Sequence, residues 1–115
     1  MVLEIKGGRR VVIATLKGDL DHHGCQQIRQ DIDSVISMPS TKILVLDMTH
    51  ISFMDSSGMG LLLARNKLAM DNQVQLIICG ASVEITKLLQ MVNLDKQIPL
   101  FSTLEQAIEY VERRG

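Results

Sequence analysis

Aromatic residues are scarce in this sequence of 115 residues, which has two phenylalanines, one tyrosine and no tryptophan. Proteins that bind single-stranded nucleic acid stack bases on aromatic side chains, so this scarcity argues against such a function. The net charge of −1 also leaves no excess of cations for the basic face of a nucleic-acid binder. The core must be built from leucine, isoleucine, valine and methionine, and we expect no direct nucleic-acid partner.

Cysteine is also rare, because only Cys25 and Cys79 occur, and their separation matches neither a zinc site nor a disulfide framework. No apolar run approaches the roughly 20 residues that span a membrane. No signal peptide precedes the first strand-like run. We therefore expect a protein of the reducing cytoplasm, with no membrane partner, no metal and no bound cofactor.

The length suits one domain over residues 1–115, and a hydrophobic share of 46% is too high for a disordered chain. Short β-rich runs over residues 2–5 and 10–16 are joined through Gly7-Gly8. Paired glycines supply the positive φ angles of a tight turn, so these runs predict a β-hairpin. The segment 18–21 is expected to end the second strand.

Apolar periodicity places the remaining elements. A stripe at i, i+4, i+7 and i+8 predicts a helix over residues 23–37, and continuous apolar runs at 43–47 and 74–79 predict strands buried on both faces. Three more helices are expected. The first follows residue 55 and has residues 65–67 on its solvent-exposed side. The second is capped by Ser82, and the third begins with a capping box of Ser102 and Glu105. The order predicts an α/β fold, a mixed and mostly parallel sheet opened by a hairpin and packed with about four helices.

The stretch FMDSSGMG (53–60) places polar, bendable residues between a buried strand and a helix. We expect a loop of about seven residues after the strand, held down by its apolar residues, and a helix that begins at Asp55 or Ser56. The first N–H groups of a helix are unpaired and create a positive potential, which tolerates a phosphate on serine. Ser56 and Ser57 both qualify as acceptors. The segment 21–23 (DHH) is expected near the same edge of the sheet.

Several enzyme classes do not fit. A hydrolase elbow needs G-x-S-x-G, but Met54 stands where the first glycine belongs. The DHH triplet lacks the further ligands of a metal phosphoesterase, and no P-loop string occurs. A phosphorylated receiver with Asp47 as acceptor would need an acidic pair after the first strand. We expect no enzyme, although a nucleophilic Ser56 remains an alternative.

Two segments, SFMDSSGMGLLLARNK (52–67) and LKGDLDHHGCQQIRQDI (16–32), resemble the STAS-domain family of anti-sigma factor antagonists. The similarity extends over essentially the whole chain, and DLDHH is most similar to the sporulation anti-sigma-F antagonists. The resemblance implies a regulator that binds an anti-sigma factor, itself an ATP-dependent serine kinase with bound nucleotide, and so releases a sigma factor.

The resemblance also implies roles for single residues. The kinase phosphorylates the first serine after the motif aspartate, Ser56, which ends tight binding, and a metal-dependent serine phosphatase restores the hydroxyl. Asp21 matches an acidic position that contacts the kinase, and we expect its replacement to change stability little. Gly58 and Gly60 are expected to clear the backbone for close approach. The expected partner-binding residues are Asp21, His22, Asp55, Ser57, Gly58 and Met59.

Two alternatives share this fold. One is an antagonist of a general stress pathway, with the same chemistry and another kinase. The other is a STAS module that senses a small ligand or nucleotide in a pocket beside the motif.

Overall fold

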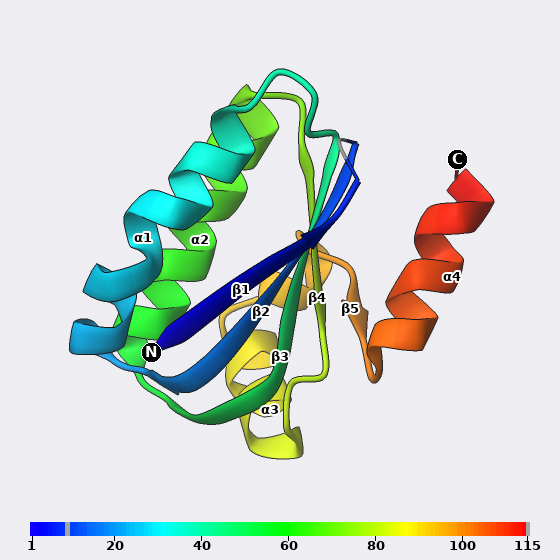
Figure 1. Cartoon of the computed structure of the whole chain (residues 1–115). Coiled ribbons are helices and arrows are strands. Elements are labelled where there is room, and N and C mark those ends of the chain that lie inside the picture. Colours follow the sequence, from blue (N-terminus) through cyan, green and yellow to red (C-terminus); the bar gives the residue numbers. More distant parts are fainter. Residues whose placement is uncertain (9, 115) are drawn as a thin grey trace.

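The computed structural model describes residues 1–8 and 10–114, the last without its side chain. Its elements, in chain order, are β1 (Val2–Gly7), β2 (Val11–Leu20), α1 (His22–Ser37), β3 (Ile43–Met54), α2 (Ser56–Asp71), β4 (Gln75–Cys79), α3 (Val83–Met91), the 3-10 turn η1 (Leu94–Lys96), β5 (Leu100–Phe101) and α4 (Leu104–Arg114) (Figure 1).

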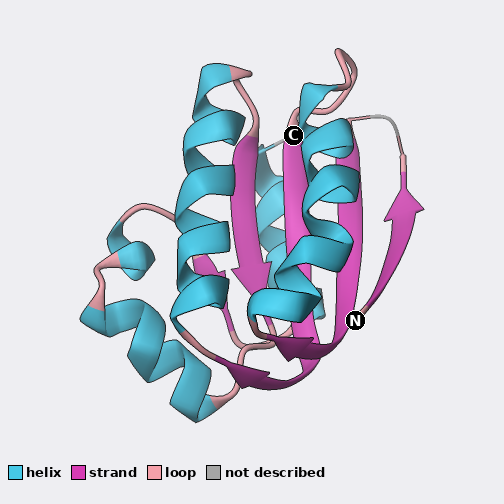
Figure 2. Cartoon of the chain, turned by 90° about the vertical axis from the view of Figure 1, so that its left-hand side faces the viewer, coloured by secondary structure: helices cyan, strands magenta, loops and turns pink. Residues whose placement is uncertain are grey.

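The five strands form one sheet in the order β1-β2-β3-β4-β5, with β1 antiparallel to β2 and every other pair parallel. This confirms the mixed, mostly parallel sheet opened by a hairpin. Gly7 has the expected positive φ angle (+108°), but Gly8 does not, and Arg9 lies outside the described residues. Figures 1 and 2 show α1 and α2 side by side on one face of the sheet, and α4 stands on the opposite face.

The central strands have a core on each face. Leu44, Leu46 and Ile78 pack with α1, α2 and α3, whereas Val45 and Ile77 pack with α4. Successive side chains of a strand point to opposite faces, so a strand covered on both sides reads as a continuous apolar run. This explains why residues 43–47 and 74–79 are continuous apolar runs.

Strands β2 and β3 are both longer than expected. Strand β3 continues to Met54, where we expected a loop. Strand β2 continues through residues 18–20, where we expected it to end. The pairing steps from Thr15↔Asp47 to Lys17↔His50, which leaves one extra residue in β3. Such a bulge breaks the alternation by which a strand is recognised, yet it keeps the two strands paired.

Two further expectations about helices are wrong. Asn66 is only 5% exposed and does not lie on a wet side, because it shares the core-facing stripe of Leu62 and Ala69. Helix α4 begins at Leu104, so Thr103 is its flanking residue, and the Thr103 hydroxyl accepts from the Gln106 N–H at 3.2 Å. This bond from Gln106 to Thr103 replaces the capping box that we expected between Ser102 and Glu105.

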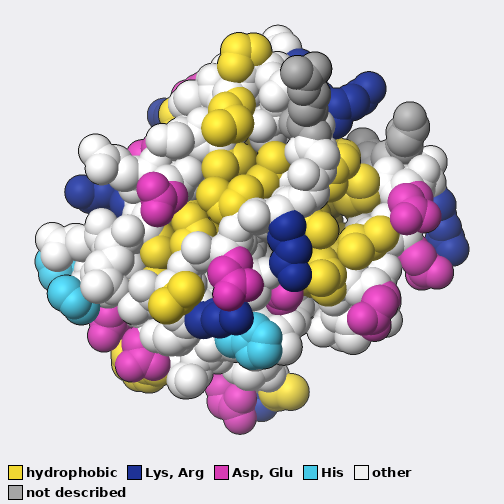
Figure 3. Space-filling model, viewed as in Figure 1, with side chains coloured by type: hydrophobic (Ala, Val, Ile, Leu, Met, Phe, Trp, Pro, Cys, Tyr) yellow, Lys and Arg dark blue, Asp and Glu magenta, His cyan; other side chains and the backbone are white. Residues whose placement is uncertain are grey.

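Two other local predictions are confirmed. Helix α1 spans the stretch expected from periodicity, and the Ser82 hydroxyl caps α3 by accepting from the Ile85 N–H at 3.1 Å. Figure 3 shows acidic and basic side chains interspersed on the face that it presents, which agrees with the small net charge. Within the described part of the chain, no helix combines the length and apolarity needed to cross a membrane.

Candidate functional site

Strands β2 and β3 end side by side, with Leu20 in register with Met54. Each strand passes through a single aspartate into a helix, Asp21 before α1 and Asp55 before α2 (Figure 1). The DHH segment and the DSSG segment therefore meet at one edge of the sheet, as expected. Functional groups of α/β proteins concentrate at such carboxyl ends of parallel strands.

Ser56 is the first residue of α2 and its side chain is exposed. The capping role belongs to Asp55, whose Oδ1 accepts from the Ser57 N–H at 2.9 Å. Among the described residues, the Ser56 hydroxyl has no hydrogen-bond partner. Its backbone is therefore fixed by the helix and the cap, while its oxygen is available to another molecule.

Ser57 differs from Ser56 although the two are adjacent. It is half-buried and lines a small hollow of about 250 Å³ together with His22, Cys25 and Arg29. Ser56 is therefore the more exposed of the two residues. The structure thus distinguishes two hydroxyls between which the sequence chemistry does not choose.

Asp21 is a structural cap, which corrects our expectation that it has little part in stability. Its Oδ1 accepts from the Gly24 N–H at 2.8 Å at the start of α1. Loss of such a cap costs about 1 kcal/mol. The residue is still half-exposed, so capping does not prevent a partner from contacting it.

Gly58 is buried, and the close approach that we expected toward a partner is made within the chain. A Cβ atom at this position would lie 2.6 Å from the Leu20 carbonyl oxygen. The glycine therefore lets α2 pack against the end of β2. Gly60 is exposed, and a Cβ atom there would meet nothing within 4 Å, while Met59 is half-buried against the core.

One ion pair joins the two helices along their length, and one thiol near their starts has a shifted pKa. The Arg65 guanidinium pairs with both carboxylate oxygens of Asp33, at 2.8 and 3.1 Å, and so ties α2 to α1. Burial, followed by the charges of Asp55 and Asp21, raises the pKa of the Cys25 thiol. Within the described chain, no three His, Cys, Asp or Glu side chains lie together in a way that would hold a metal ion.

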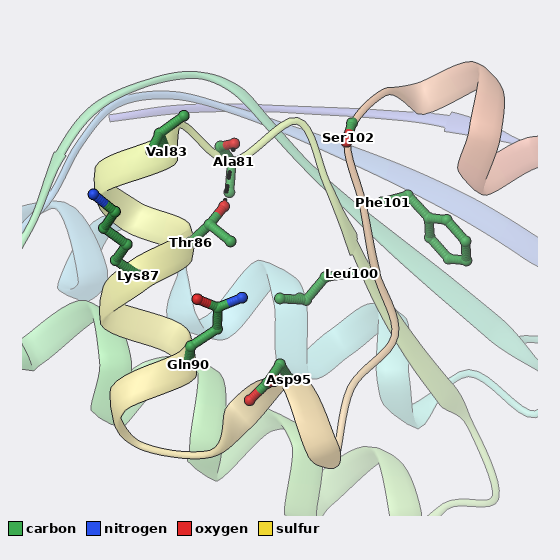
Figure 4. A pocket seen from close by; sticks show the side chains of 9 residues that line it. All are labelled: Ala81, Val83, Thr86, Lys87, Gln90, Asp95, Leu100, Phe101 and Ser102. Carbon is green, nitrogen blue, oxygen red and sulfur yellow. Dashed lines mark hydrogen bonds between the residues drawn. The ribbon is translucent and has the colours of Figure 1, made fainter.

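A hollow of about 720 Å³ lies away from the motif, between α3, η1 and β5 (Figure 4). Its lining consists of Ala81, Val83, Thr86, Lys87, Gln90, Asp95, Leu100, Phe101 and Ser102. None of these residues belongs to the DSSG or DHH segments. Smaller hollows lie beside the two segments, one of about 250 Å³ at Ser57 and one of about 300 Å³ at Asp21 and His23.

The sequence interpretation missed one exposed side chain at this edge. Phe53 was expected to hold a loop down, but it is 52% exposed on β3. The cause is a second bulge, at Ser52, which no periodicity in the sequence reveals.

The fold and the motif agree with a known family, since the STAS domain profile matches residues 2–107. The chain belongs to the STAS-domain family. The anti-sigma F factor antagonist of Paenibacillus polymyxa is 32% identical over 96% of this chain and 94% of that protein. The antagonist of the same name from Lysinibacillus sphaericus is 34% identical over 90% and 87%.

A solved structure extends the comparison to three dimensions. This STAS domain matches the Bacillus cell fate determinant SpoIIAA in its phosphorylated form, with a TM-score of 0.76 and 31% identity over 96% of this chain and 99% of that one. The resemblance to anti-sigma factor antagonists, and the sporulation group within them, is thereby confirmed.

Proposed function

We propose that this chain is an anti-sigma factor antagonist whose binding is switched by phosphorylation of Ser56. The observation that carries the proposal is the exposed, unpaired Ser56 hydroxyl on a backbone that Asp55 has already capped. A relative that exists in a phosphorylated form supports it, as do relatives named anti-sigma F factor antagonist. In its unphosphorylated form the chain binds an anti-sigma factor and releases the sigma factor.

Phosphorylation changes the charge of this surface rather than the fold. The kinase transfers the γ-phosphoryl group of ATP to the Ser56 oxygen, and the hydroxyl proton leaves to a base on the kinase. The product carries about −1.5 to −2 charges at neutral pH. The N-terminus of α2 tolerates this charge, so the domain stays folded.

The partner's surface does not tolerate the same charge. A kinase site shaped for a neutral hydroxyl also holds nucleotide phosphates, and a dianion placed beside them is repelled. A tenfold loss of affinity takes only about 1.4 kcal/mol. The site that contacts the kinase comprises Asp21, His22, Asp55, Ser57 and Met59 around Ser56, with Gly58 supporting it from beneath. A metal-dependent phosphatase resets the switch.

The acceptor is tested by incubating the protein with ATP and purified anti-sigma factor kinases of the sporulation and general-stress pathways. Mass spectrometry is expected to locate one phosphate on Ser56, and Ser56→Ala is expected to abolish it. Ser57→Ala is the matched control and should still be phosphorylated. Modification confined to Ser57, or none with either kinase, would count against the proposal.

Ser56→Asp tests whether charge is the switch. This variant should melt like the parent, because a carboxylate at the start of a helix is favourable, yet bind the kinase at least tenfold more weakly. Ser56→Asn, which has a similar size and no charge, should bind more tightly than Ser56→Asp. Equal binding by the parent and Ser56→Asp would exclude a charge-based switch.

The same experiment separates the alternatives. Faster phosphorylation by the general-stress kinase would assign the chain to that pathway, whereas the DLDHH segment and the named relatives favour the sporulation pathway. Saturable nucleotide binding by the free protein, without modification by either kinase, would favour a sensor. Ester hydrolysis lost in Ser56→Ala would favour an enzyme.

A further inference from the structure

Phe53 is an aromatic side chain that the fold does not use. Its side chain is 52% exposed, whereas the other phenylalanine, Phe101, packs against Tyr110 with ring centroids 5.0 Å apart. A half-exposed phenylalanine contributes much less to folding than a buried one, because the hydrophobic gain follows the area removed from water. Phe53 stands three residues before Ser56 in the sequence.

A β-bulge directs this ring toward solvent. In simple alternation from the buried Ile51, Phe53 would be buried and Met54 exposed. The register instead steps from Gly18↔Ile51 to Asp19↔Phe53, so that Ser52 is an extra residue in β3. As a result Met54 is 4% exposed and enters the core, while Phe53 points outward. Bulges next to functional sites commonly re-aim one side chain in this way.

Accessible aspartates occupy positions next to Phe53 on the two strand ends. Asp19 is its register partner on β2 and is exposed, and the half-exposed caps Asp21 and Asp55 follow the ends of the same two strands. An exposed apolar ring on strand ends that also carry exposed carboxylates has the composition of a binding hot spot with a polar rim. Both parts lie on the strand ends that present Ser56.

We propose that Phe53 is the hydrophobic anchor by which the anti-sigma factor kinase holds this chain. The ring inserts into an apolar pocket of the kinase, and cationic or N–H groups around that pocket face Asp19 and Asp21. This contact holds β3 on the kinase, while the intact start of α2 presents the Ser56 oxygen to the nucleotide. The inference rests on the proposed function and adds the residue that supplies most of the affinity of the unphosphorylated form.

Replacing Phe53 and replacing the aspartates near it should change the kinetics of kinase binding in different ways. Truncating a buried anchor raises the dissociation rate, whereas removing a rim charge lowers the association rate and its dependence on salt. Phe53→Ala should therefore weaken kinase binding at least tenfold through faster dissociation, with an unchanged salt dependence. Asp19→Asn should slow association and flatten the salt dependence. In phosphorylation assays Phe53→Ala should raise KM and leave kcat unchanged, because the start of α2 is intact.

Binding is measured by surface plasmon resonance with the full chain and the nucleotide-bound kinase at several salt concentrations. The matched control is Met38→Ala, since Met38 is 50% exposed and follows the C-terminal end of α1, at the opposite edge of the sheet. Met38→Ala should bind like the parent, and Phe53→Tyr should restore most of the affinity lost in Phe53→Ala. Phe53→Arg keeps an aliphatic stem over β3 while charging the exposed end, so it should fold and bind as weakly as Phe53→Ala.

The outcomes separate this inference from the proposed function. If the parent neither binds nor is phosphorylated by any kinase tested, the proposed function fails. If the parent binds, and Phe53→Ala and Phe53→Arg both bind within twofold of it, then Phe53 is not the anchor. The proposed switch at Ser56 is unaffected by that result. A loss of affinity in Phe53→Ala that comes only from slower association also overturns the anchor.

Discussion

The two helix starts at this edge of the sheet are built alike. Helix α1 begins with D-H-H-G (21–24) and α2 with D-S-S-G (55–58). In each, the aspartate caps the helix through Oδ1 and the glycine is buried against a β2 carbonyl oxygen, that of Asp19 or of Leu20. Capping and close packing are thus common to both starts.

The difference lies in the two residues between the cap and the glycine. His22 and Ser56 occupy the same exposed position, directly after the capping aspartate. Because the cap and the glycine complete the helix start without them, neither side chain is needed to begin its helix. A position that is not needed for capping or packing can carry a residue with a chemical role. At α2 this residue is Ser56, whose hydroxyl is the phosphate acceptor that we propose.

Replacing the buried glycines should have the largest effect on stability. Gly58→Ala and Gly24→Ala each place a Cβ against a backbone oxygen that cannot move aside, so each should lower the free energy of unfolding by about 1–3 kcal/mol. Urea denaturation followed by circular dichroism measures the loss. Gly58→Ala should also shift the end of β2 and weaken kinase binding.

The control is Gly60→Ala, two residues further along α2. Nothing lies within 4 Å of a Cβ at this position, so alanine should raise stability by about 0.5–1 kcal/mol through helix propensity. Opposite signs for two glycines of one motif would show that packing, and not the motif itself, requires Gly58. Stabilisation by both substitutions would contradict the packing seen here.

Replacing the caps should have a smaller and matched effect. Asp21→Ala and Asp55→Ala each remove one side-chain acceptor of a helix N–H and should cost about 1 kcal/mol, measured as a lower melting temperature. Asp21→Asn and Asp55→Asn keep the acceptor and should restore most of that stability. If Asp21→Asn is stable but binds the kinase weakly, the charge of Asp21 contacts the partner in addition to capping α1.

The sequence predicted the parts of the fold that depend on local pattern. Helix α1, the hairpin turn and the Ser82 cap follow from periodicity or from a residue's own backbone preference. The capping box of α4 was displaced by one residue because Ser102 and Thr103 are both good caps. Local chemistry does not decide between two adjacent residues of the same kind.

The sequence did not predict features that arise from the pairing of β2 with β3. The extra residues in β3 are defined only relative to β2, so the second half of β3 and the exposure of Phe53 were not visible in the pattern. The burial of Gly58 has the same origin, because the atom that it approaches belongs to Leu20. The motif pointed to the candidate site, and the non-local pairing determined which of its residues face outward.

The smallest predicted effect concerns the reactivity of Cys25, which follows Gly24 and is influenced by the charges at both helix starts. A cysteine at a helix start commonly has a lowered pKa, but burial and then the charges of Asp55 and Asp21 raise that of Cys25. A raised pKa leaves less thiolate near pH 8, so iodoacetamide should modify native Cys25 more slowly than a free thiol, with a rate that rises as the pH increases. Asp55→Asn removes one of these charges and should raise the rate at pH 8.

The second cysteine supplies the internal reference for this measurement. Burial and Asp47 raise the pKa of Cys79 to about 12, so this thiol should react only after unfolding. Phosphorylation of Ser56 adds negative charge near Cys25 and should slow its modification further. Equal Cys25 rates in the parent, in Asp55→Asn and in the phosphorylated protein would mean that the two helix starts are electrostatically independent.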